Sequence, residues 1–139
     1  MTWTFHLGDL DSADVQSLLS LHLKSTRSCS PEISFWSLRE DGLLLGFGAL
    51  KQLSPDRGEV KSMRTAAHAL GRGVGTAMLH HIVTEARRRG YRSLSLETGS
   101  TQPFAAALRL YTREGFASSE AFGDYSPTPF TRFFTLALD

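Results

Sequence analysis

The chain has 139 residues, 41% of them hydrophobic and 21% charged, a balance typical of one globular domain. Fifteen lysines and arginines against 14 aspartates and glutamates leave a formal net charge of +1, far from the basic excess that favours binding to a nucleic-acid backbone. The single cysteine, Cys29, excludes an internal disulfide, and no Cys/His spacing typical of a metal site occurs. We therefore expect one domain over residues 1–139, with no metal and no nucleic-acid partner.

The first residues of the chain include acidic side chains where a signal peptide has a basic stretch followed by an apolar run. No apolar run approaches the roughly 18 residues that a membrane-spanning helix needs. These two features predict a cytoplasmic protein with no membrane partner.

The chain begins with a strand pattern followed by a helix pattern. Residues 2–7 alternate between apolar and polar side chains, which predicts a strand. Ser12 can cap a helix after it, because the residues that follow recur at helical spacing on one face. That face carries Val15, Leu18, Leu19, His22 and Leu23.

Strand and helix patterns continue to the end of the chain. An Asp41-Gly42 pair between two strand patterns is typical of a two-residue hairpin turn, and Gly90 is placed to end a helix. The predicted strands cover residues 35–39, 43–51, 59–65, 93–97, 116–122 and 130–138, and the predicted helices cover residues 71–89 and 103–114. The apolar residues of the first of these helices follow helical spacing: Val74, Met78, Leu79, Ile82, Val83 and Ala86. This order of strands and helices predicts a single α/β domain with a mostly antiparallel sheet.

A glycine-rich turn joins the strand at 59–65 to the helix that follows. Glycines 71, 73 and 75 let the main chain turn tightly and present its N–H groups at a helix N-terminus, where the dipole favours a phosphate group. Arg72 can add a positive charge. The segment has neither the Gly-Lys-Ser/Thr of a Walker loop nor the setting of a dinucleotide fingerprint. It therefore predicts a phosphate-binding turn, with a flexible loop before a helix as the alternative.

Two segments together resemble the GNAT (Gcn5-related N-acetyltransferase) superfamily. Residues 59–76 are similar to its central motif, Gln/Arg-x-x-Gly-x-Gly/Ala, with Leu70 at the Gln/Arg position. Residues 103–116 are similar to its later motif, Asn-x-x-Ala-x-x-Leu-Tyr-x-x-x-Gly-Phe, with Phe104 at the Asn position. The resemblance implies a mixed, mostly antiparallel central sheet flanked by helices and split between its two central strands.

The resemblance also implies that acetyl-CoA is the acyl donor and CoA a product. In the family the pantetheine arm pairs with the strand before the glycine turn, and the amides of the turn hold the CoA diphosphate. The cofactor-binding residues implied here are Met63, Arg64, Thr65, Gly71, Arg72, Gly73, Val74, Gly75 and Thr76.

Five further side chains are candidates for the chemistry and for the acceptor. Tyr111, as a phenol near its ordinary pKa of about 10, can protonate the leaving CoA sulfur, with a core-filling tyrosine as the alternative. Glu59 can take the amine proton unless it is a solvated strand-end carboxylate, and Glu97 is either a rival base or an acceptor-binding group. His22 and Tyr125 are the remaining predicted acceptor-binding residues, with a satisfied half-buried histidine as the alternative for His22.

Other charged and aromatic groups have ordinary structural interpretations. His80 and His81 are expected at the surface of their helix, and Phe35 and Trp36 are expected in the core. The arginines at 87–89 suit the negative end of a helix dipole better than a nucleic-acid surface.

The sequence thus predicts an acetyl-CoA-dependent N-acetyltransferase that acts on the amine of a small molecule or peptide by direct attack in a ternary complex. A catalytically idle CoA-binding or regulatory module is the main alternative, because Leu70 and Phe104 depart from the family motifs. A nucleic-acid-binding domain is a weaker alternative. Sheet edges near the C-terminus often pair in relatives, so a homodimer is also considered.

Overall fold

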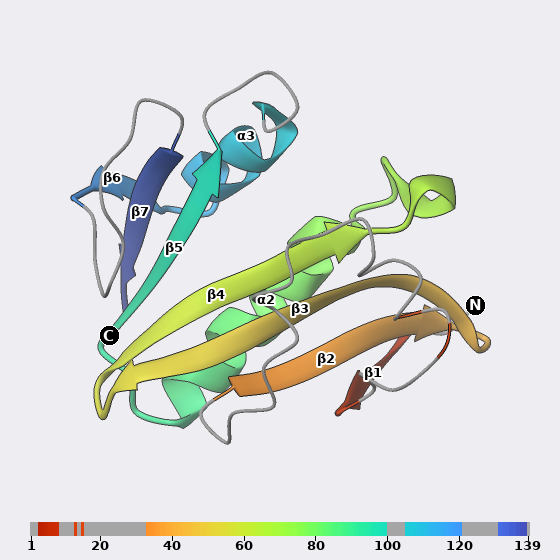
Figure 1. The fold of residues 1–139 in the computed structure, drawn as a ribbon, viewed down its shortest axis with the longest axis horizontal. Helices are drawn as coiled ribbons and strands as arrows, with labels where there is room; N and C mark the ends of the chain where they lie inside the picture. Colours follow the sequence, from red (N-terminus) through yellow and green to blue (C-terminus); the bar gives the residue numbers. More distant parts are fainter. Residues whose placement is uncertain are drawn as a thin grey trace.

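The computed structural model describes residues 3–8, 13, 15, 33–99, 105–120 and 131–138. These residues form a seven-stranded sheet in the order β1-β2-β3-β4-β5-β7-β6, together with helices that pack against it (Figure 1). The strands are β1 (Trp3–Leu7), β2 (Ile33–Glu40), β3 (Leu43–Ser54), β4 (Arg57–Thr65), β5 (Ser93–Gly99), β6 (Ala117–Ser119) and β7 (Thr131–Ala137). The helices are the short 3-10 helix η3 (Ala67–Ala69), α2 (Val74–Arg88) and α3 (Ala105–Arg113).

The β2–β3 hairpin forms as its turn sequence predicts. Asp41 and Gly42 have φ values of 50° and 87°, the left-handed pair that a two-residue turn between twisted strands requires. The observed strands are longer than the predicted ones, because main-chain pairing extends β2 to Ile33 and β3 to Ser54. These residues lie beyond the segments in which apolar and polar side chains alternate clearly.

The sheet is divided between β4 and β5, which are its only parallel pair among the described strands. Helix α2 makes the crossover between them. Their pairing joins residues 57–60 to residues 93–96 and then stops, although β4 continues to Thr65 and β5 to Gly99. Figure 1 shows the two strands diverging from this point. The predicted split of the sheet between its central strands is therefore confirmed.

Helix α2 supplies one side of the main core. Its buried residues are the six predicted from helical spacing: Val74, Met78, Leu79, Ile82, Val83 and Ala86. The helix lies close against β3 at Gly48, where a Cβ atom would come within 2.8 Å of Met78 Cγ. It ends at Gly90, whose φ of 83° reverses the chain as predicted. No helix in the described part of the chain is long and apolar enough to cross a membrane.

A second apolar cluster lies on the opposite face of the sheet. Phe35 and Trp36 are both buried, as predicted, but as strand neighbours they point to opposite faces: Trp36 packs with α2, and Phe35 packs with Phe47. Val15 joins the Phe35 cluster and is fully buried. Of the helix predicted after Ser12, the structure describes only Ala13 and Val15, both helical.

The two histidines of α2 differ, and the prediction that both lie at the surface is wrong for His81. His80 is exposed and pairs with Glu114. The ring of His81 instead stacks on Phe5, 4.0 Å between centroids, and meets the Trp36 ring at its edge. Burial lowers the pKa of His81, and its Nε2 atom has no hydrogen-bond partner among the described residues. Strand β1 covers this turn of the helix, which helical spacing alone does not reveal.

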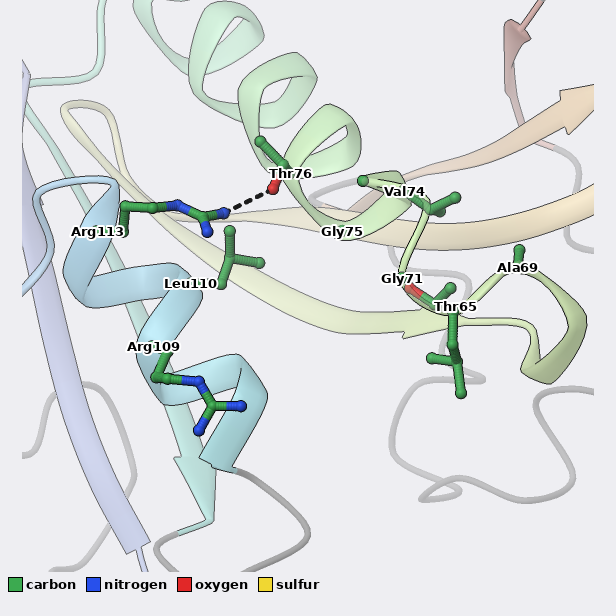
Figure 2. Close-up of a pocket in the computed structure, with 11 residues that line it drawn as sticks. Thr65, Ala69, Gly71, Val74, Gly75, Thr76, Arg109, Leu110 and Arg113 are labelled. Atoms are coloured by element: carbon green, nitrogen blue, oxygen red, sulfur yellow. Dashed lines mark hydrogen bonds between the residues drawn. The ribbon is translucent and has the colours of Figure 1, made fainter.

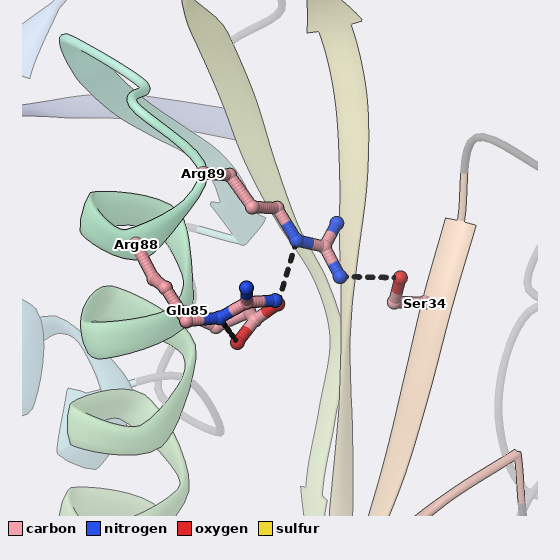
Figure 3. A network of polar contacts seen from close by, with 4 residues as sticks. All are labelled: Ser34, Glu85, Arg88 and Arg89. Atoms are coloured by element: carbon pink, nitrogen blue, oxygen red, sulfur yellow. Dashed lines mark hydrogen bonds and ion pairs between the residues drawn. The ribbon is translucent and has the colours of Figure 1, made fainter.

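The arginine run at the C-terminal end of α2 is attached to its own helix and to β2 (Figure 3). Arg88 and Arg89 both pair with Glu85, and the hydrogen bond from Arg88 is the main reason that the pKa of Glu85 falls to about 2. Arg89 also donates to Ser34 Oγ at 2.8 Å. Two of the three arginines are thus engaged within the domain, as expected for a charged helix end.

Candidate active site

A cavity of about 280 Å³ opens at the N-terminus of α2, between the end of β4, the glycine turn and α3 (Figure 2). We call it the turn cavity. It is lined by Thr65, Ala69, Leu70, Gly71, Gly73, Val74, Gly75, Thr76, Arg109, Leu110 and Arg113. The fold therefore places α3 beside the predicted phosphate-binding turn, although the two are far apart in the sequence.

The glycine turn presents main-chain N–H groups to this cavity. Gly71 and the N-cap residue Gly73 have φ values of 79° and 83°, which glycine adopts without strain. Ala77 donates to the Gly73 carbonyl, so the N–H groups of residues 74–76 precede the helical hydrogen-bond ladder. The N-cap residue, a glycine, makes no side-chain cap to them, and the first turn of α2 has no acidic residue. The positive end of the helix dipole is therefore available to an anion.

Gly75 allows α3 to approach the turn. A Cβ atom at this position would lie 3.3 Å from Leu110 Cδ2, tighter than most real contacts. Next to it, Arg113 Nη2 donates to Thr76 Oγ1 at 2.9 Å. The third glycine of the motif thus serves helix packing as well as access to the main chain.

Arg109 and Arg113 line the turn cavity, and the sequence analysis did not identify them. Figure 2 shows both side chains extending from α3 on the side of the glycine turn. The sequence did contain a signal for them, because Arg109 and Arg113 are four residues apart and so lie on one face of the predicted helix. The resemblance to the family motif directed attention to its named positions, and both arginines occupy unspecified ones.

Arg72 occupies a different place from the one expected. It does not line the turn cavity; its Nη2 lies 3.0 Å from Glu40 Oε2. Its guanidinium carbon is also 5.6 Å from the centre of the Trp3 ring. The hydrogen bond to Arg72 lowers the pKa of Glu40, which is 9% exposed. The charge predicted to face a phosphate is therefore paired with a carboxylate at the end of β2.

Strand β4 is irregular where the resemblance places the pantetheine arm. Phe47 and Ala49 of β3 pair with Arg64 and Lys61, so β4 has one extra residue between these pairs. Such a bulge interrupts the ladder and leaves a main-chain group without a strand partner. Since β4 is also unpaired with β5 beyond Val60, residues 61–65 have strand neighbours on one side only. Met63 and Arg64 lie within this stretch and are partly exposed.

The two candidate carboxylates share one face of the sheet, opposite α2. Glu59 is 2% exposed, so the alternative of a solvated strand-end group is wrong; the strand begins two residues earlier, and β3 and β5 flank Glu59 in the sheet. Burial, and then the charge of Glu59, raises the pKa of Glu97, while Lys61 opposes the shift. Glu97 is thus a stronger base than an ordinary carboxylate.

Tyr111 lies in the apolar core on the inner side of α3. It is 7% exposed, and its ring meets that of Phe116 at 5.8 Å between centroids. Desolvation raises the pKa of Tyr111 to about 12, so the expectation of a phenol near pKa 10 is wrong. Its interior position was the alternative considered from the sequence, and a buried phenol can still donate a hydrogen bond.

Two predicted acceptor-binding residues, His22 and Tyr125, lie outside the described residues. Phe104, at the Asn position of the later motif, lies outside them too. Within the described ranges, no group of three or more His, Cys, Asp or Glu side chains could hold a metal ion.

Comparison with known proteins identifies the family of this fold and site. The model of the acetyltransferase (GNAT) family matches residues 6–116, and the chain belongs to this family. It is 43% identical to an uncharacterized N-acetyltransferase of Bacillus subtilis, over 95% of this chain and 97% of that protein. It is 39% identical to an uncharacterized N-acetyltransferase of Escherichia coli, over 98% and 95% of the two chains.

The fold is also that of solved GNAT structures. A GNAT family acetyltransferase from Elizabethkingia anophelis, with acetyl-CoA bound, superposes with a TM-score of 0.81 and covers 98% of both chains at 16% identity. At this identity the likeness establishes the fold alone.

Proposed function

We propose that this protein transfers the acetyl group of acetyl-CoA to the amine of a small molecule or peptide, by direct attack within a ternary complex. The turn cavity carries the proposal, because the first N–H groups of α2, a first helical turn without an acidic residue and two arginines meet there. These groups suit the diphosphate of CoA. Family membership supports an acetyltransferase, and a neighbour of the same fold binds acetyl-CoA.

In this proposal the diphosphate binds to the amides of residues 73–76, and the pantetheine arm lies along residues 61–65 of β4. A main-chain N–H group near Met63 or Arg64 donates to the thioester oxygen. A fixed donor of this kind stabilises the negative charge that develops on that oxygen during attack. The bulge in β4 is the feature that leaves such a donor available.

Acetyl transfer to an amine requires two proton movements. The amine nitrogen attacks the carbonyl carbon, the C–S bond breaks with its electron pair on sulfur, and the nitrogen loses one proton while the sulfur gains one. The chain must therefore position the amine, accept a proton and stabilise the leaving thiolate.

Tyr111 supports the leaving sulfur by hydrogen-bond donation. With a pKa of about 12 its hydroxyl keeps its proton throughout the working pH range. A thiol has an ordinary pKa of about 8.5, so complete proton transfer from this phenol to the thiolate is unfavourable. We therefore assign Tyr111 a charge-stabilising role, with the thiolate protonated by solvent.

Glu97 binds the incoming ammonium form, and Glu59 takes one of its protons, directly or through a water molecule, to leave the neutral amine that attacks. The second proton passes from the nitrogen to solvent after the attack. Both carboxylates lie where β4 and β5 begin to separate, on the face opposite α2. Their mutual repulsion, which contributes to the raised pKa of Glu97, is relieved when a cationic amine binds between them.

The test is release of free CoA from acetyl-CoA, measured across amines, amino acids, polyamines, antibiotics and peptide N-termini. We expect release that depends on one class of acceptor, and calorimetric binding of acetyl-CoA in its absence. Binding without release for any acceptor would favour the idle CoA-binding module. No binding of acetyl-CoA at all would overturn both.

A further inference from the structure

Arg72, at the centre of the glycine turn, meets one residue of β1 and one residue of β2. Glu40 Oε2, at the end of β2, accepts hydrogen bonds from Arg72 Nη2 at 3.0 Å and from Trp3 Nε1 at 3.2 Å. The side chain of Glu40 is 10% exposed and that of Arg72 is 35% exposed. We call these three residues the turn anchor.

The glycine turn needs such an attachment. Arg72 lies between Gly71 and Gly73, which both have positive φ and have nothing within 4 Å of where a Cβ would be. Glycine loses more conformational entropy on ordering than any other residue, and packing does not restrain these two. Among the residues that the structure describes, the Arg72 side chain links the centre of the turn to β1 and β2.

We infer that Arg72 and Glu40 are positioning residues, which hold the glycine turn in the conformation whose amides bind the CoA diphosphate. The inference rests on the proposed function. Arg72 contributes through the main chain at either side of it, because its guanidinium is already paired with a carboxylate. An amide site that is ordered before the ligand arrives binds it with a smaller entropic cost.

The competing account is that Arg72 leaves Glu40 and contacts the diphosphate itself. The two accounts give opposite predictions for Glu40. If Glu40 positions the turn, removing its charge weakens acetyl-CoA binding. If Glu40 only competes for Arg72, removing its charge leaves binding unchanged or strengthens it.

A double-mutant cycle distinguishes them. We expect Glu40→Gln and Arg72→Met each to raise the Kd and KM for acetyl-CoA about three- to tenfold, with kcat changed less than about twofold. The double variant should bind acetyl-CoA at least as tightly as the single variant with the lower affinity, because both changes break the same contact. Arg72→Lys should recover part of the affinity. Asp41→Asn is the matched control for the lost carboxylate, since Asp41 is the exposed neighbour of Glu40. Additive effects, or tighter binding by Glu40→Gln, would overturn the inference.

Hydrogen exchange without ligand provides a second readout that does not depend on CoA. Amides of residues 71–76 should exchange several-fold faster in Glu40→Gln than in the parent or in Asp41→Asn, while amides at the centre of α2 stay unchanged. Equal exchange in all three proteins would overturn the inference. Faster exchange in Glu40→Gln, together with a parent protein that does not bind acetyl-CoA, would support the anchor and reject the proposed function.

Discussion

Tyr111 combines two properties that are set by one environment. It fills core space beside Phe116, and the same burial raises its pKa to about 12. A group of this kind is a persistent hydrogen-bond donor and a poor proton donor to a thiolate. Its position in the family motif and its place in the core are therefore compatible.

We predict that Tyr111→Phe lowers kcat about 10- to 100-fold and changes the Kd for acetyl-CoA less than about twofold. The hydroxyl interacts with charge that appears only as the C–S bond breaks. Steady-state kinetics and calorimetry measure the two quantities. Tyr91→Phe is the control, because Tyr91 is a second buried tyrosine, packed at the far end of α2. An unchanged kcat would remove Tyr111 from the mechanism.

His81 makes the stability of the folded protein depend on pH in the mildly acidic range. Its folded pKa is below the ordinary value of 6.5, because burial disfavours the charged ring more than Glu85 favours it. The unfolded chain therefore binds a proton more readily, and stability is lost as pH falls from about 6.5 towards the folded pKa. We predict that His81→Phe flattens the pH dependence of the melting temperature below about pH 6.5. His6→Phe, at an exposed histidine of β1 whose ring contacts the Thr4 hydroxyl, should keep the parental slope.

The turn cavity joins the N-terminus of α2 to one face of α3. Main-chain amides come from the first helix and arginine side chains from the second. The contacts of Gly75 with Leu110 and of Thr76 with Arg113 fix the distance between them. A helix dipole whose first turn has no acidic residue and two nearby cations act on an anion in the same direction.

We predict that Arg109→Gln and Arg113→Gln each weaken acetyl-CoA binding about 5- to 20-fold, through loss of a charged hydrogen-bond donor. The weakening should shrink at high salt, since exposed charges are screened. Arg87→Gln is the control, because this exposed arginine lies at the other end of α2. Calorimetry at two salt concentrations measures the effect, and parental affinity in both variants would show that neither arginine contacts the ligand.

The domain consists of two half-sheets joined by a short ladder. Strands β1–β4 with α2 form one part, strands β5–β7 with α3 form the other, and the ladder between β4 and β5 covers residues 57–60 and 93–96. The turn cavity has walls from both parts. A ligand in it therefore adds contacts across the line where strand pairing stops.

We predict that acetyl-CoA slows hydrogen exchange in α3 as well as in residues 71–76. Acetyl-CoA at 100 times its Kd should stabilise the whole domain by about 2.7 kcal/mol. Hydrogen exchange with mass spectrometry and thermal melts measure the two effects. Protection limited to the glycine turn would show that α3 does not contribute to binding.

The sequence by itself determined the elements and the place of the turn. Helical spacing identified the buried face of α2, and Asp41-Gly42 and Gly90 marked chain reversals that the structure contains. These features depend on side-chain periodicity and on the φ values each residue tolerates, which are local properties. The glycine motif located the turn cavity for the same reason, because a turn and the helix after it present their own N–H groups.

Only the tertiary structure decided which charges and which buried groups surround that site. Arg72 pairs with Glu40, 32 residues away in sequence, while Arg109 and Arg113 reach the cavity from another helix. Glu59 is buried within the sheet, and Phe5 of β1 stacks on the ring of His81. Ion pairing and desolvation depend on groups brought together by the fold, so residue spacing along the chain does not reveal them.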